Sequence, residues 1–487
     1  MPRTRRRHVL FAALLALGGA AGTHAASSAT DPLPAVIQQI DAGDFRSATA
    51  RIDAALADPK LDAQSRDALQ FQRERMRRIR LDFTLSADQA RAKLRESIPD
   101  LREDEFQRWT DADLLEHMVI DGTPWYFSRS VSNLFRVSPE AMARRATPFP
   151  RTDGPMENAN AYHDAAVAEA RRTGKSSVAP RRIRVTQSIT VNADAVPAGE
   201  TVRAWIPYPR ALPGRQENIR LLSSAPAQHR VAPESTMQRT VYLEKPAVAG
   251  QPTTFSIDYE LTVYGEHHRI DPERVRPLGD RPDLAPFLAQ RPPHIVFTDQ
   301  MRAFSQKVVG DEKNPYRIAQ KLFQAVDAIP WGGAREYSTI SNISDYALRG
   351  NHADCGQQTL LLMTLLRLNG IPSRWQSGMV YSDGTYDNLH DWGALYLAPY
   401  GWVPMDVTTG QFKGARDPDV EWFYLGGLDA YRIAFNDDIS TPFVPAKQHM
   451  RSETVDSQRG EVEWAGGNLY FDQWDYSFTA KVLAAAD

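Results

Sequence analysis

Cysteine is almost absent from this sequence: a single residue, Cys355, occurs among 487. One thiol cannot form an internal disulfide, and it excludes zinc sites built from several cysteines. An intermolecular bond, a buried inert side chain or a reactive nucleophile remain as its possible states. The neighbouring pairs His267-His268 and Glu116-His117 lack the spacing of metal ligands. We therefore expect no metal and no cofactor.

A large excess of charge of either sign is also missing. The formal net charge is −3, with 57 Lys and Arg against 60 Asp and Glu, so nothing in this balance favours nucleic acid as a partner. Hydrophobic residues make up 42% and charged residues 24%, which is ordinary for a soluble globular protein. The length predicts several domains.

Long hydrophobic runs are missing after residue 25, so we expect no stable membrane span. Residues 1–25 carry four arginines, an apolar run at 9–17 and a small-residue end at Ala25-Ala26. This order is typical of a signal peptide cleaved near Ala25 or Ala26, and it predicts a periplasmic or secreted protein. The apolar run is too short for a comfortable membrane anchor. The export route, Sec or twin-arginine, stays open.

Two changes of pattern divide the rest of the chain. Residues 27–180 favour helices, including a capping box at Ser86 and Gln89, whereas residues 181–265 contain alternating apolar and polar positions typical of antiparallel strands. A cluster of prolines and a hairpin signal at 465–468 mark further boundaries. The predicted parts are a signal peptide (1–25), a helical region (26–180), a β-sandwich-like domain (181–270), a Pro-rich linker (271–297), a catalytic domain (298–445) and a C-terminal β-hairpin extension (446–487).

The sole cysteine is predicted to open a buried helix. Asp354 precedes it and Gln357 follows three residues after Asp354, which is a helix-start pattern. Residues 360–366 are almost continuously apolar, and Gly370 is suited to the helix end. In a first helical turn, free N–H groups and the helix dipole favour an anion. We therefore expect a thiol pKa lowered from about 8.5 toward about 3.5–7.5, with a buried inert thiol as the alternative.

A thiol nucleophile needs a base, and the following segment provides one. Residues 373–381, 390–397 and 402–406 favour strands separated by turns. Adjacent antiparallel strands can bring His390 beside Asp406, whose carboxylate would orient the imidazole.

Three motifs in this segment resemble the transglutaminase-like superfamily. Asp354-Cys355 opens an apolar helix followed by Arg367 and Gly370-Ile371-Pro372-Ser373-Arg374. His390 precedes Trp392 by two residues, and Gly401-Trp402 precedes Asp406. The resemblance covers about residues 300–410. One departure is Ala353, where the family commonly has glycine.

This resemblance implies an α+β fold with a papain-like transglutaminase core, and acyl transfer on a peptide or carboxamide. Cys355 would attack the carbonyl, His390 would carry the proton and Asp406 would hold His390. The Cys355 backbone N–H would serve the oxyanion. Trp331 is either a second donor or a core aromatic residue. Arg374 is expected to serve structure.

The fate of the acyl-enzyme separates the remaining hypotheses. Water would give a peptidase or amidase, which is the expectation that the breadth of the superfamily favours. A primary amine would give a protein-glutamine γ-glutamyltransferase that cross-links proteins. A non-catalytic binding module and a scaffold of the cell envelope are the alternatives without chemistry. The predicted partner is a peptide or protein substrate.

Overall fold

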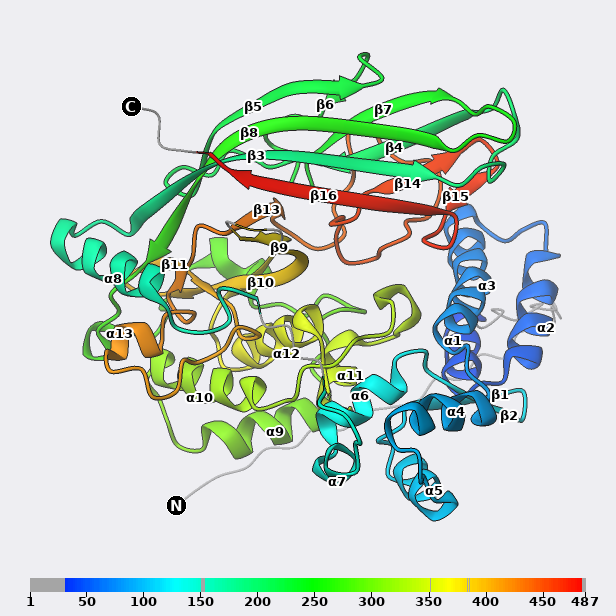
Figure 1. Cartoon of the computed structure of the whole chain (residues 1–487), viewed down its shortest axis with the longest axis horizontal. Coiled ribbons are helices and arrows are strands. Elements are labelled where there is room, and N and C mark those ends of the chain that lie inside the picture. The colour runs from blue at the N-terminus through cyan, green and yellow to red at the C-terminus, as the bar shows by residue number, and fades with distance from the viewer. Residues whose placement is uncertain (1–30, 150–153, 351, 383, 385, 484–487) are drawn as a thin grey trace, which may run out of the picture.

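A computed structural model describes residues 31–149, 154–350, 352–382, 384 and 386–483. The predicted signal peptide and its cleavage site lie outside these residues. The chain has an α+β fold, as predicted, with a helical region, a β-sandwich and the domain that is predicted to be catalytic (Figure 1). None of the helices in the described part is both long and apolar enough to cross a membrane.

Short amphipathic helices build the N-terminal region, where the predicted capping box at Ser86 and Gln89 is confirmed. Two apolar clusters form the interior of residues 33–149, whereas the buried side chains of residues 161–173 join the large core of the rest of the chain. The helices are α1 (Leu33–Asp41), α2 (Phe45–Leu56), α3 (Ala63–Asp82), α4 (Ala87–Ser97), α5 (Glu103–Asp111), α6 (Ser130–Val137), α7 (Pro139–Ala143) and α8 (Ala161–Thr173).

One hairpin interrupts this helical region and was not predicted. It pairs β1 (His117–Ile120) with β2 (Thr123–Tyr126). Asp121 and Gly122 form its turn with φ of 51° and 89°, the left-handed conformation that two-residue hairpin loops require.

Two facing sheets form the β-sandwich. One contains β12 (Gly427–Leu428), β8 (Thr253–His267), β3 (Ser177–Val191) and β16 (Trp474–Val482), with β5 (Gln216–Ala225) also paired to β8. The other contains β15 (Gly467–Leu469), β14 (Glu461–Trp464), β4 (Thr201–Pro207), β7 (Thr240–Pro246) and β6 (Arg230–Val231). Alternate residues of β8, such as Phe255, Ile257 and Tyr259, are buried, as its period-two pattern predicts.

The C-terminal segment completes this sandwich, so the prediction of a separate extension at 446–487 is wrong. The predicted hairpin exists as β14 and β15, but β14 also pairs with β4, and β16 pairs with β3 along its whole length (Figure 1). Pairing satisfies the backbone groups that β3 and β4 would otherwise expose at sheet edges, and it buries Trp474 and Phe478. The catalytic domain is therefore an insertion between strands of one sandwich.

The proline-rich segment 271–297 is not a free linker. It contains the 3-10 helices η1 (Pro272–Arg274) and η2 (Pro282–Phe287). Leu284 and Ile295 are buried, and Arg276 forms a β-bridge with Ala398 of the catalytic domain. The segment is therefore packed against its neighbours.

The catalytic domain places one buried helix against a four-stranded antiparallel sheet. The helix is α12 (Cys355–Leu368), and the sheet order is β11 (Gly401–Met405), β10 (Asp387–Leu397), β9 (Ser373–Tyr381) and β13 (Arg432–Asn436). These bounds confirm the predicted helix start and three predicted strands. Around them lie α9 (Asp299–Val309), α10 (Pro315–Asp327), η3 (Tyr337–Thr339), α11 (Ile343–Arg349) and α13 (Pro418–Glu421).

The N-terminal region is anchored to both other parts. Arg75 on α3 donates to the backbone oxygen of Thr339 at 3.2 and 3.0 Å, and Arg78 donates to the oxygen of Ser452 at 2.9 Å. On α6, the buried Asn133 donates to the oxygen of Gly333 and accepts from its N–H, both at 2.9 Å. These bonds fix the loop that leads toward Cys355.

Candidate active site

The predicted helix start positions the sulfur of Cys355. Asp354 is the N-cap of α12: its Oδ1 accepts from the backbone N–H of Gln357 at 3.0 Å, and the Gln357 side chain accepts from the Asp354 N–H at 3.2 Å. This reciprocal capping fixes the first turn. Buried leucines along the helix hold it against β10, so Cys355 has a defined place at the edge of the sheet.

His390 and Asp406 meet as predicted from their strands. Gly393 of β10 lies opposite Met405 of β11, which places Asp406, just past the end of β11, close to His390. The His390 Nε2 lies 2.7 Å from Asp406 Oδ2. Because a carboxylate accepts hydrogen bonds, Nε2 of His390 carries the proton and donates a hydrogen bond to Asp406 in this contact. Nδ1 of His390 is then the ring nitrogen that can accept a proton.

Asp406 is a fully buried carboxylate with several donors. Its Oδ1 accepts from the backbone N–H groups of Thr408 and Thr409 at 3.2 and 3.1 Å, and its Oδ2 accepts from the Thr409 hydroxyl at 2.8 Å. Burial acts to raise the pKa of Asp406, but the charges of His390 and Arg432 outweigh it and hold the pKa well below its usual range. Asp406 is therefore ionised at neutral pH.

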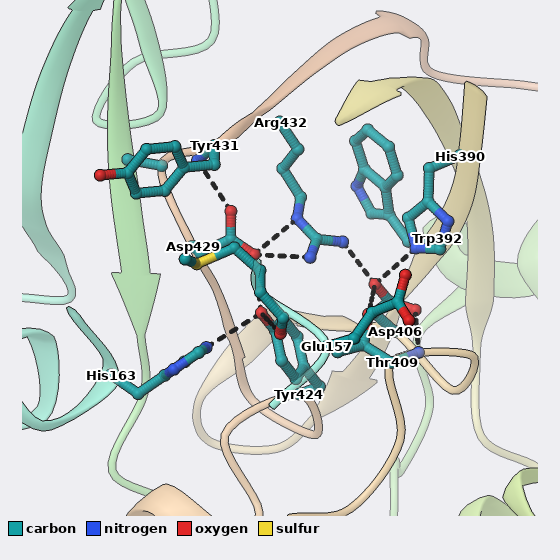
Figure 2. Close-up of polar contacts among 12 residues, drawn as sticks. Glu157, His163, His390, Trp392, Asp406, Thr409, Tyr424, Asp429, Tyr431 and Arg432 are labelled. Carbon is teal, nitrogen blue, oxygen red and sulfur yellow. Dashed lines mark hydrogen bonds and ion pairs between the residues drawn. The ribbon is translucent and has the colours of Figure 1, made fainter. Parts of the chain in front are cut away.

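Arg432 links Asp406 to a second buried carboxylate (Figure 2). Its NH1 donates to Asp406 Oδ2, while its Nε and NH2 donate to Asp429 Oδ2 at 3.0 and 2.5 Å. Tyr424 donates its hydroxyl to the same Asp429 oxygen at 2.7 Å, and His163 of α8 lies 3.1 Å from that hydroxyl. The catalytic sheet is thus connected to α8 through polar contacts.

The thiol of Cys355 is held by Asp391 instead of His390. Its Sγ lies 3.2 Å from Asp391 Oδ2, and no hydrogen bond joins Cys355 to His390 in the described part of the chain. Neighbouring residues on a strand point to opposite sides. In the described strands, β11 pairs with residues 393–397 of β10, whereas Asp391 pairs with Ser377 of β9.

The expected lowering of the thiol pKa is wrong for this arrangement. Burial raises the pKa of Cys355 well above its usual value, and the charges of Asp391 and Asp354 add to the effect. A hydrogen bond from the Asp391 backbone N–H acts in the opposite direction. A helix N-terminus contributes about 0.3–1 kcal/mol at exposed sites and up to about 2 kcal/mol in partly buried ones, which is too little to offset burial and two nearby carboxyls.

The C-terminal segment supplies two further groups around Asp391. Gln458 donates to Asp391 Oδ1 at 2.9 Å and to the backbone oxygen of His390 at 2.7 Å. Asp456 hydrogen-bonds the Asp391 carboxyl and accepts from the Ser377 hydroxyl at 2.6 Å. Burial and the charge of Asp456 raise the pKa of Asp391 well above its usual range, so the surroundings of this carboxyl favour its protonated form.

Sequence reasoning missed several of these residues, and only one had a clear signal. Arg432 stands in the apolar run 431–435, and a charged residue inside a buried strand implies an ion pair. Asp391, Asp456 and Gln458 have no local signal, because they come together only through the fold.

Other predicted residues lie around this centre. Trp331 is 39% exposed, with the Arg136 guanidinium 4.6 Å from its ring centroid, so it is not a core residue. Arg374 stacks on Trp402, 4.7 Å from the ring centroid, and thus has the structural role expected of it. Ala353 forms a bridge with Trp331. In the described residues, no three His, Cys, Asp or Glu side chains gather in a cluster that could hold a metal ion.

Comparison with known proteins identifies the family of this domain. Residues 302–407 match the model of the Transglutaminase-like superfamily. A comparison with curated proteins finds no match. Among solved structures, the chain is similar to a candidate cysteine protease from Cytophaga hutchinsonii, with 15% identity, a TM-score of 0.41, and coverage of 64% of this chain and 93% of that one.

A second solved structure is the periplasmic domain of TgpA from Pseudomonas aeruginosa. The identity is 14% and the TM-score 0.25, over 52% of this chain and 96% of that one. Both TM-scores lie below 0.5, so the fold of the whole chain rests on its own strand pairing.

Proposed function

We propose that this chain, whose residues 302–407 form a transglutaminase-like domain, is a cysteine-dependent acyl-transfer enzyme that acts on peptides or carboxamides and hands the acyl group to water. The observation that carries the proposal is the pairing of His390 with the buried Asp406, with Nε2 and Oδ2 2.7 Å apart, beside the helix that begins with Cys355. Nucleophile, base and orienting carboxylate are the parts that thiol catalysis needs.

The proposed reaction requires that the Cys355 thiol leave the Asp391 carboxyl, which it contacts at 3.2 Å, and come within hydrogen-bonding reach of His390. His390 Nδ1 takes the thiol proton, because Nε2 is already bonded to Asp406. The thiolate attacks the carbonyl carbon, and the backbone N–H of Cys355 at the start of α12 donates to the developing oxyanion. His390 then returns the proton to the leaving amine, and a thioester to Cys355 remains.

The second half releases the acyl group. His390 Nδ1 takes a proton from water, the resulting hydroxide attacks the thioester, and the proton returns to Cys355 Sγ as the acid leaves. A primary amine can take the place of water, and the product is then a new amide. Hydrolysis is the proposal because the superfamily's breadth favours it.

The test compares wild type with Cys355→Ala on a library of glutamine-containing peptides, with and without an added primary amine. We expect Cys355→Ala to lose activity by several orders of magnitude, since removal of a triad nucleophile has that effect, while its circular dichroism stays that of wild type. Unchanged turnover in Cys355→Ala contradicts the proposal, and preferential incorporation of amine contradicts its hydrolytic part.

We also propose that the enzyme works outside the cytoplasm, in the periplasm or as a secreted protein. The support is the order of basic, apolar and small residues in 1–25.

A further inference from the structure

Arg432 lies between two buried carboxylates, those of Asp406 and Asp429 (Figure 2). The side chains of Arg432, Asp406 and Asp429 are exposed by 1% or less. One guanidinium therefore lies between two carboxylates with almost no water. A buried ion is stable only when charges and hydrogen bonds compensate its lost hydration. The ionisation of Asp406 therefore depends on the charge and the position of Arg432.

Arg432 is fixed from both sides. Its NH1 reaches Asp406, and its Nε and NH2 reach Asp429. Asp429 is itself held by the Tyr424 hydroxyl at 2.7 Å and by the backbone N–H of Tyr431 at 2.7 Å. The planar guanidinium can bridge two carboxylates in this way, which a lysine ammonium cannot.

The other charged and titratable groups near this cluster do not replace Arg432. Among the described residues, His390 is the other group beside Asp406 that can carry a positive charge. Around Asp429 are Arg215, His163, Tyr162, Tyr381 and Tyr424. Arg215 donates to backbone oxygens, including that of Asp429 at 2.8 Å, and forms no hydrogen bond to Asp406 in the described residues.

We propose that Arg432 is a positioning residue for the His390–Asp406 pair. It holds Asp406 Oδ2 against His390 Nε2 and keeps this carboxylate ionised, while Asp429 holds Arg432. The inference rests on the proposed function, in which His390 is the base. Its mechanism is electrostatic: without Arg432, two adjacent buried carboxylates would lose the cation that lies between them, and protonation of Asp406 would become more favourable.

The experiment uses the full chain and a signal that needs no substrate. A histidine proton in a short bond to a buried carboxylate has a strongly downfield proton resonance, and its shift can be followed against pH. The variants are Arg432→Gln, Arg432→Lys and the double variant Arg432→Gln/Asp429→Asn. Arg184→Gln is the matched control, because Arg184 is half exposed on the sandwich and pairs with Asp258.

In Arg432→Gln we expect the pH midpoint at which the resonance of the His390–Asp406 hydrogen bond changes to move up by at least one pH unit. We also expect kcat/KM near neutral pH to fall at least tenfold on a substrate found with the peptide library. In the double variant, the midpoint should return part of the way to its wild-type value and kcat/KM should rise in part, because the second carboxylate, Asp429, is no longer there to repel Asp406. Arg432→Lys should move the midpoint by a smaller amount. Arg184→Gln should behave as wild type.

An unchanged midpoint in folded Arg432→Gln overturns the inference, even if activity falls, because a purely structural residue would lower activity without moving the titration. Should Arg432→Gln fail to fold, an unchanged midpoint in Arg432→Lys overturns it. Failure of the proposed function gives a different result: the resonance moves as expected, but Cys355→Ala and wild type have the same turnover.

Discussion

Replacement of Asp391 by asparagine removes the carboxyl that holds the only thiol of the chain. The charge of Asp391 and the hydrogen bond from Sγ both raise the pKa of Cys355. Asparagine is nearly the same size and can donate to a thiolate, so Asp391→Asn should lower the thiol pKa. Burial and Asp354 also contribute, and those contributions remain in the variant.

The size of the change follows from the 3.2 Å contact. Two unit charges at this distance, one on Asp391 and one on a Cys355 thiolate, repel each other by about 5 kcal/mol when the effective dielectric constant is about 20. The pKa of Asp391 is raised by burial and by Asp456, to which it is hydrogen-bonded, and Cys355 is partly exposed, so we expect a fraction of this energy. A change of about 1.4–2.7 kcal/mol corresponds to about one to two pH units.

The assay is the rate of iodoacetamide labelling against pH, which has one possible target because the chain has one cysteine. Each unit of lowered pKa raises the thiolate fraction about tenfold and reduces its intrinsic nucleophilicity about threefold. Labelling near neutral pH should thus rise about threefold per unit. Asp387→Asn, at the exposed start of the same strand, is the control. Equal or slower labelling of folded Asp391→Asn would refute the reasoning.

Two further predictions concern stability and export. Burial raises the pKa of Asp82 on α3 to about 7 from an ordinary 3.8. The fold therefore favours the neutral acid, stability is highest below about pH 4 as far as this group is concerned, and it falls by up to about 4 kcal/mol as the pH rises to about 7. Urea unfolding across this range should show the decline, and Asp82→Asn should lack it. For export, the intact mass of secreted protein should correspond to a new N-terminus near Ala26, and a retained Met1 would contradict the signal-peptide prediction.

The parts that the sequence predicted well are local in the chain. The start of α12 follows from Asp354 and Gln357, which cap it within four residues. The strands around His390 follow from period-two patterns and turns over about thirty residues. Their pairing places His390 beside Asp406, because short turns leave antiparallel neighbours little choice of register.

The parts that the sequence did not predict depend on distant contacts. Val191 pairs with Trp474, and Ile183 pairs with Val482, although no pattern within either strand predicts which strand it pairs with. Gln458 reaches Asp391 for the same reason. The thiol pKa was misjudged because the helix start is visible in the sequence, whereas the burial and the Asp391 carboxyl that oppose it are visible only in the fold.

The insertion of the catalytic domain into the sandwich also sets an order of events during synthesis. When a ribosome has completed residue 407, every motif of the superfamily has been made, but Arg432, Asp456 and Gln458 have not. Strand β3 also lacks its partner β16, whose residues follow those of β3 with which they pair by 283 to 299 positions in the sequence. Pairing over such separations is slow. The nascent chain therefore carries Cys355 through about the last quarter of translation before the residues around it are complete, and the proposed site is finished only when the last strand of the sandwich is in place.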